Sequence, residues 1–95
     1  MADARLLRPI PNPFSATTSL AYAVPGSAGQ NVDVDIYDAA GRKVRSLVSA
    51  VRPAGQHTAT WDGRDGGGSR VAAGVYFYRV VIGSEAASRR VVVLR

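Results

Sequence analysis

The fold class is decided by residues 32–44, which read VDVDIYDAAGRKV. In the first half, aliphatic residues alternate with polar ones, which is the period of a β-strand with one buried face. In the second half, Asp38 stands where a type I turn favours an acceptor side chain, and Gly41 stands where the chain needs a positive φ. The stretch therefore predicts a β-hairpin with a three-residue loop and a G1 bulge.

This turn also predicts how the two strands pair. The opposed pairs are Ile36–Val44 and Val32–Val48 on the buried face, and Asp35–Arg45 and Tyr37–Lys43 on the wet face. A four-residue loop would place Lys43 beside Ile36, so it is rejected. Leu47 points outward in the predicted register, which requires either a second bulge or a neighbouring loop that covers it.

The rest of the chain has the same pattern of strands and turns. Short runs rich in Val, Tyr, Thr and Ile alternate with clusters of Gly, Pro, Asn and Asp. The expected strands are 17–24, 32–37, 43–48, 57–61, 75–82 and 87–94, with a further short one near 5–9. Six or seven such strands, without helical periodicity, predict an all-β sandwich.

Three residues are expected to be structural. Phe14 follows Pro11 and Pro13, which restrict the backbone before it, and is free to plug one end of the core. Trp61 ends an alternating strand in a chain without cysteine and is read as a core anchor. Gly41 completes the set as the turn residue.

Length and composition bound the organisation. A chain of 95 residues closes one core, so residues 1–95 are predicted to be a single domain. The absence of cysteine excludes disulfides and thiolate zinc sites. No run approaches the ~20 apolar residues that span a bilayer, and the N-terminal apolar stretch is too short for a signal peptide. An exported form is therefore expected to be part of a longer chain.

The net charge of +5 predicts a basic surface. The arginines are spread over several segments, and no aromatic residues interleave them as a single-strand nucleic-acid binder would need. We expect no nucleic-acid binding, and a surface that is solvated or faces an anionic glycan.

The residue inventory argues against catalysis. His57 is the single histidine and lies in a strand beside Thr58 and Thr60, with no nucleophile elbow in the chain. We expect a strand histidine, no enzymatic activity and no cofactor.

The glycine-rich stretch 62–69 raises the question of calcium, because acidic side chains on such loops are ligands of that ion. Its spacing departs from the EF-hand, and Arg64 and Arg70 add positive charge. A structural turn, in which Asp62 and Asp65 accept backbone hydrogen bonds, is the favoured interpretation, with weak calcium binding left open.

Five motifs occur in a specific order: PNPF at 11–14, IYDAAGRKV at 36–44, WDGRD at 61–65, GVYFYR at 74–79 and RVVVLR at 90–95. Over residues 9–95 this order resembles the immunoglobulin-like domain of flagellar hook-capping proteins, and equally the C-terminal sorting domain of type IX secretion cargo. The resemblance implies an immunoglobulin-like β-sandwich of about seven antiparallel strands, located at the end of a larger exported bacterial protein.

In cargo proteins such a domain is recognised by the outer-membrane export machinery and can hold the protein at the cell surface. The resemblance thus implies a secreted or surface-located monomer. Its expected partners are the parent protein's upstream domains and either the export machinery or an anionic cell-surface glycan. The alternative is a structural module, as a hook-cap domain or as a spacer or carbohydrate-binding module of a secreted hydrolase.

Candidate partner residues are placed in the last strands. They are Gly74, Tyr76, Arg79, Arg89, Arg90 and Arg95. Two departures from the sorting family are evident: its closing strand often has a lysine where this chain has arginines, and Ser15-Ala16 stands where Asn-Pro usually follows the first motif.

Overall fold

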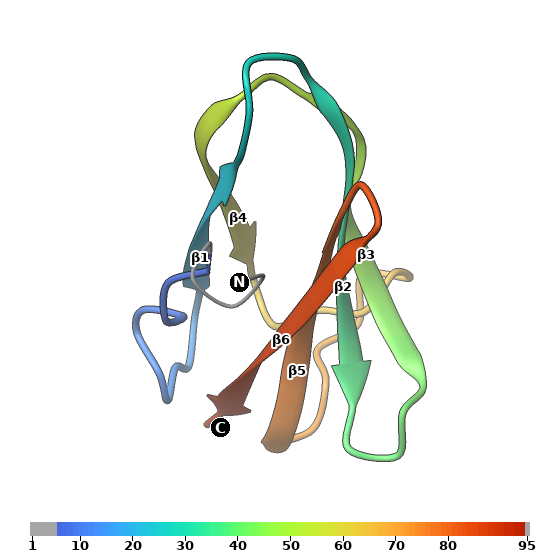
Figure 1. The fold of residues 1–95 in the computed structure, drawn as a ribbon. Coiled ribbons are helices and arrows are strands. Elements are labelled where there is room, and N and C mark those ends of the chain that lie inside the picture. Colours follow the sequence, from blue (N-terminus) through green and yellow to red (C-terminus); the bar gives the residue numbers. More distant parts are fainter. Residues whose placement is uncertain (1–5, 95) are drawn as a thin grey trace.

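The computed structural model describes residues 6–94 as a β-sandwich of six antiparallel strands without a helix (Figure 1). The strands are β1 Thr18–Val24, β2 Gln30–Asp38, β3 Lys43–Arg52, β4 Gly55–Trp61, β5 Gly74–Ile82 and β6 Glu85–Val93. One sheet pairs β1 with β4, and the other has the order β3-β2-β5-β6. Figure 1 shows how the β1–β2 and β3–β4 connections cross between the two sheets at the same end of the sandwich.

The expected count of about seven strands is corrected to six. Residues 6–10 run along β1 but meet it only through isolated bridges, Leu6 to Tyr22 and Ile10 to Ser19. Residues 6–10 do not form a continuous strand with β1 because Pro9 has no N–H to donate to a ladder. Residue 5 of the expected short strand lies outside the described residues.

The motif at 11–14 carries the chain from the first sheet to the edge of the second. The Asn12 amide donates from Nδ2 to the Arg90 carbonyl (3.0 Å) and accepts at Oδ1 from the Val92 N–H (2.9 Å). Phe14 then continues with its backbone, donating to the Val92 carbonyl (3.0 Å) and accepting from the Leu94 N–H (2.7 Å). This Asn12–Phe14 clamp covers the C-terminal half of the β6 edge and ties the two sheets together.

The core lies between the sheets and is built around Trp61. The Trp61 side chain is fully buried and Phe14 is 2% exposed, so the predicted burial of both is confirmed. Phe14 and Tyr76 each place a ring centroid 5.4 Å from that of Trp61, a spacing at which tilted aromatic pairs attract. Tyr78 donates to the Thr18 carbonyl (3.2 Å), and burial raises the pKa of this phenol above its ordinary value.

The turn of the β2–β3 hairpin is confirmed. Gly41 has φ +86° and donates to the Asp38 carbonyl (3.0 Å). The Asp38 carboxylate accepts from the backbone N–H groups of Arg42 (2.9 Å) and Ala40 (3.0 Å). The hydrogen bond from the Arg42 N–H stabilises the ionised carboxylate and is the main reason that the pKa of Asp38 is lowered.

Most of the predicted register is wrong, although the Tyr37–Lys43 pair is confirmed. The pairs Ile36–Val44, Val32–Val48 and Asp35–Arg45 do not form; the structure pairs Ile36 with Arg45, Asp35 with Ser46, Val34 with Val48 and Val32 with Ala50. Two register shifts leave Val44 and Leu47 without an opposed residue. Both pack against the core, so two bulges, rather than one, direct aliphatic side chains inward. A second bulge is one of the two explanations that the sequence offers for Leu47.

Gly41→Ala is expected to lower the free energy of unfolding by about 1 kcal/mol. A Cβ at this site meets open space, so the cost comes from the positive φ, roughly 1–2 kcal/mol, partly offset by the lower entropy of the unfolded chain. Gly67→Ala is the matched control, because Gly67 is outside the positive-φ set and a Cβ there makes only an ordinary contact, 3.5 Å from Asp65 Oδ1. Urea unfolding of both variants checks this; equal losses would contradict it.

Candidate functional site

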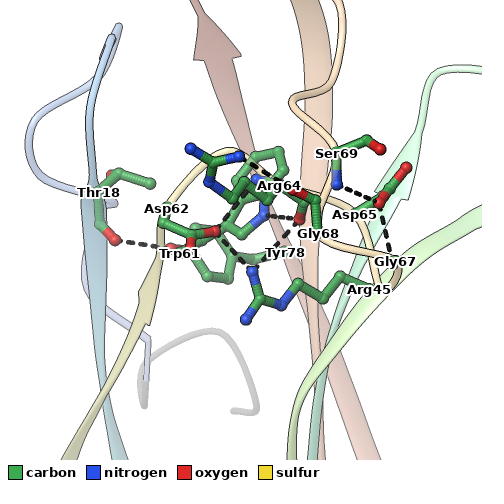
Figure 2. Close-up of polar contacts among 10 residues, drawn as sticks. All are labelled: Thr18, Arg45, Trp61, Asp62, Arg64, Asp65, Gly67, Gly68, Ser69 and Tyr78. Carbon is green, nitrogen blue, oxygen red and sulfur yellow. Dashed lines mark hydrogen bonds and ion pairs between the residues drawn. The ribbon is translucent and has the colours of Figure 1, made fainter.

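The loop between β4 and β5 is a structural turn held by its own aspartates and by Arg45 of β3 (Figure 2). Asp62 Oδ1 accepts from Arg45 Nη1 (2.6 Å) and from the Arg64 N–H (3.1 Å). Asp65 Oδ1 accepts from the N–H groups of Gly67 and Ser69, both at 3.0 Å. These contacts favour the turn interpretation over calcium, because both carboxylates already accept from protein donors. Within residues 6–94, no group of three or more His, Asp or Glu side chains gathers as a metal site would require.

The same loop is fastened to the core. Trp61 donates from its indole Nε1 to the Arg64 carbonyl (2.8 Å), and Arg64 donates from Nη1 to the Gly68 carbonyl (2.9 Å). Figure 2 shows Arg45 reaching from β3 towards Asp62. Arg45 was expected to pair with Asp35, and the register shift explains why it reaches this loop instead.

His57 has a structural environment. Its ring Nε2 lies 2.8 Å from the Pro53 carbonyl, and the ring stacks on Tyr22 with centroids 5.6 Å apart. Both contacts fit a strand histidine that fixes the β3–β4 connection.

The six candidate partner residues do not form one site. Tyr76 is buried and donates to the Ala72 carbonyl (2.7 Å), and Gly74 has φ +148° at the start of β5. Arg89 points inward and donates to the carbonyls of Ser88 (3.0 Å) and Leu6 (3.4 Å). These three residues shape the sandwich itself. Arg95 lies outside the described residues.

Arg79 and Arg90 are the two exposed candidates, and the structure places them on the same surface. The inward positions of β5 and β6 are buried, so the alternate positions face out from the four-stranded sheet. Together with outward positions of β2 they form what we call the outer-face patch: Tyr37, Val75, Phe77, Arg79, Arg90 and Val92. Register pairs Phe77 with Tyr37 on one side and with Arg90 on the other.

The patch combines an apolar centre with cationic neighbours. Val75 is 38% exposed, and Phe77 and Val92 remain partly exposed. Aromatic residues and arginine are enriched in protein–protein interfaces, where they surround or fill a small apolar centre. The arrangement can therefore receive a protein surface.

Asp35 lies on β2 next to this patch, opposite Arg79. The sequence predicts a solvent-exposed side chain at this position, but Asp35 is only 8% exposed. Its carboxylate is 3.8 Å from Lys43 Nζ, and Arg79 is its register partner on β5. The ion pair with Lys43 offsets part of the cost of burying this carboxylate.

Sequence reasoning missed Val75, Phe77 and Val92. The signal was present, because residues 75–81 read VYFYRVV and are apolar on both faces of the strand. A strand with two apolar faces is typical of a sheet that is covered on both sides.

The strand order and the two-sheet core define an immunoglobulin-like β-sandwich. A family model described as FlgD Ig-like domain matches residues 13–86, so the chain belongs to the FlgD Ig-like domain family. No curated protein matches the sequence.

Three solved structures have the same fold. Dimeric latent PorU from Porphyromonas gingivalis aligns with a TM-score of 0.75 and 23% identity, over 95% of this chain and 9% of that chain. PorZ, a surface component of the type IX secretion system of the same organism, aligns at 0.69 and 24%, over 99% and 12%. FlgD from Xanthomonas campestris, a hook-capping protein of flagellar assembly, aligns at 0.63 and 24%, over 93% and 64%. This chain thus spans about a tenth of each of the first two proteins.

Proposed function

We propose that this chain is a non-catalytic module of an exported bacterial protein, and that it acts in sorting during export and in attachment at the cell surface. The outer-face patch carries the proposal, because it presents two exposed arginines and a partly exposed aromatic residue on the last two strands. Its partner would be the export machinery or an anionic cell-surface glycan, and the chain would work as a monomer attached to upstream domains.

Two further observations support this proposal. Three polar residues of the kind that enzymes use, His57, Asp62 and Asp65, are each in hydrogen-bonding contact with the backbone. PorU and PorZ each have a domain of this fold within a much longer chain, and PorZ is a component of the bacterial surface. A terminal module of an exported protein fits both observations.

The proposal predicts that the full chain, fused to the C-terminus of a passenger with its own signal peptide, moves the passenger to the surface of a host with a type IX exporter. Arg90→Glu is expected to reduce surface passenger at least about fivefold, because charge reversal opposes an acidic receptor. Arg70→Glu is the matched control, since Arg70 is exposed but lies on the β4–β5 loop. Surface proteolysis and fractionation measure both.

Thermal unfolding of the purified variants must first establish that Arg90→Glu folds. A passenger that stays in the periplasm with the intact module attached would contradict sorting. If Arg70→Glu reduces the amount of surface passenger as much as Arg90→Glu does, the effect is due to net charge and not to the outer-face patch.

The family match favours one alternative, a structural module that packs against its parent protein as a hook-cap domain would. In that case the outer-face patch would be covered by the parent's own domains. Surface delivery would then fail for the intact module, while deletion of the module would destabilise the parent protein.

A further inference from the structure

The edge of β6 differs between its two halves. In the C-terminal half, the Asn12–Phe14 clamp occupies the carbonyls of Arg90 and Val92 and the N–H groups of Val92 and Leu94. These groups belong to even-numbered residues, so the even-numbered positions of β6 direct their backbone groups away from β5. In the N-terminal half, the same alternation directs the backbone N–H and C=O groups of Ala86 and Ser88 away from β5, towards the outer side of the β6 edge.

That N-terminal half is suited to receive a strand. β6 is the last strand of its sheet within residues 6–94, and its register with β5 is regular from end to end. Ala86 and Ser88 are small and exposed, so they leave the backbone accessible. The opposite edge strand, β3, carries two bulges, which are a common protection of sheet edges. Ser88 already accepts from Arg89 Nη1, but a carbonyl oxygen has a second lone pair for another donor.

Positive charge lies beside this edge. A shallow hollow next to the clamp is lined by Arg8, Pro9, Ile10, Asn12, Arg89 and Arg90. None of its lining residues is acidic, and Ile10 is 70% exposed. Glu85 lies at the far end of the strand, next to the β5–β6 turn.

From these features we propose that the N-terminal half of the β6 edge, residues 85–90, is a docking site for an extended acidic segment of a partner protein, which adds to the sheet as a strand. Main-chain hydrogen bonds to Ala86, to Ser88 and to the N–H of Arg90, whose carbonyl already accepts from Asn12, give the affinity, as in other cases of β-strand addition. The exposed arginines of the hollow, Arg8 and Arg90, select acidic side chains. Pairing with a second copy of the same edge is disfavoured, because it brings arginines together.

The probe is a short capped peptide of alternating Val and Asp, titrated into the labelled 95-residue chain and followed by amide NMR shifts and hydrogen exchange. We expect shifts and slowed exchange centred on Ala86, Ser88 and Arg90. A peptide with Lys in place of Asp is expected to bind at least about tenfold more weakly. A peptide with the same acids but with Pro in place of Val is also expected to lose binding, since it lacks the N–H groups of a strand.

The matched variants are Ser88→Pro and Ser88→Ala. Proline removes the outward N–H of Ser88 at a position where edge strands tolerate it, so affinity for the acidic peptide should fall at least about tenfold, while alanine keeps it. If Ser88→Pro does not fold, Arg8→Gln replaces it, with an expected severalfold loss for the acidic peptide alone. Arg90 belongs to both surfaces, so the control is Tyr37→Ala, which changes the outer-face patch on β2 and should leave the peptide affinity unchanged.

Four results would overturn the docking site. These are equal binding of the acidic and proline peptides, shifts centred on β3 or β4, no binding at millimolar peptide, and a dimer that forms through β6 in sedimentation experiments.

Discussion

Trp61→Ala is expected to lower the free energy of unfolding by roughly 3–5 kcal/mol, out of the about 5–15 kcal/mol typical of a small domain. Trp61 is fully buried and contacts the rings of Phe14 and Tyr76. Its indole also donates to the Arg64 carbonyl, so the substitution removes a support of the β4–β5 loop. Denaturant unfolding followed by circular dichroism measures the loss, because Trp61 is the single tryptophan and the variant has no intrinsic indole signal.

Trp61→Phe is the control, since it keeps an aromatic ring and removes the indole N–H. We expect it to lose about half as much stability as the alanine variant. An unchanged midpoint for Trp61→Ala would contradict the central position of this residue in the core.

Phe14→Ala is expected to cost roughly 3–5 kcal/mol as well, with a second effect at the sheet edge. The Phe14 ring packs on Trp61, while its backbone pairs with β6 at Val92 and Leu94. Loss of the ring releases the clamp, so the Leu94 amide should exchange with solvent more nearly at its unprotected rate. Hydrogen exchange and urea unfolding together separate the two effects.

Phe77→Ala is the matched control, because Phe77 is the other phenylalanine of the chain and lies on the outer face. Its expected cost is at most about 1–2 kcal/mol, with the Leu94 amide unaffected. Equal costs for the two variants would show that the burial of Phe14 contributes little.

These predictions give the motif at 11–14 a physical meaning. The Asn12 side chain imitates a backbone pair at the β6 edge, and Phe14 joins that edge to the central tryptophan. The motif at 11–14, which resembles a family signature, thus holds the two sheets together. These contacts cover only the C-terminal half of the β6 edge, and the N-terminal half is the docking site that we propose.

The sequence by itself determined the features that depend on near neighbours along the chain. The alternation in residues 32–36 placed Val32, Val34 and Ile36 in the core, and the spacing from Asp38 to Gly41 predicted the turn and its positive φ. The six long strands were located because strand period and turn residues are local signals. The burial of Trp61 followed from the same alternation.

The tertiary structure decided what depends on distant segments. Two bulges in β3 arise because Val44 and Leu47 both reach a core formed by other strands, and the displaced Arg45 then pairs with Asp62. Tyr76 became structural because its ring packs on Trp61, and Arg89 because the distant Leu6 offers it a carbonyl. The pairing of β5 with β6 places Arg90 beside Phe77, on the face that Phe77 shares with Arg79. The physical reason is that side-chain period gives a residue its face, whereas register gives it its neighbours, and register is fixed only when the whole core is packed.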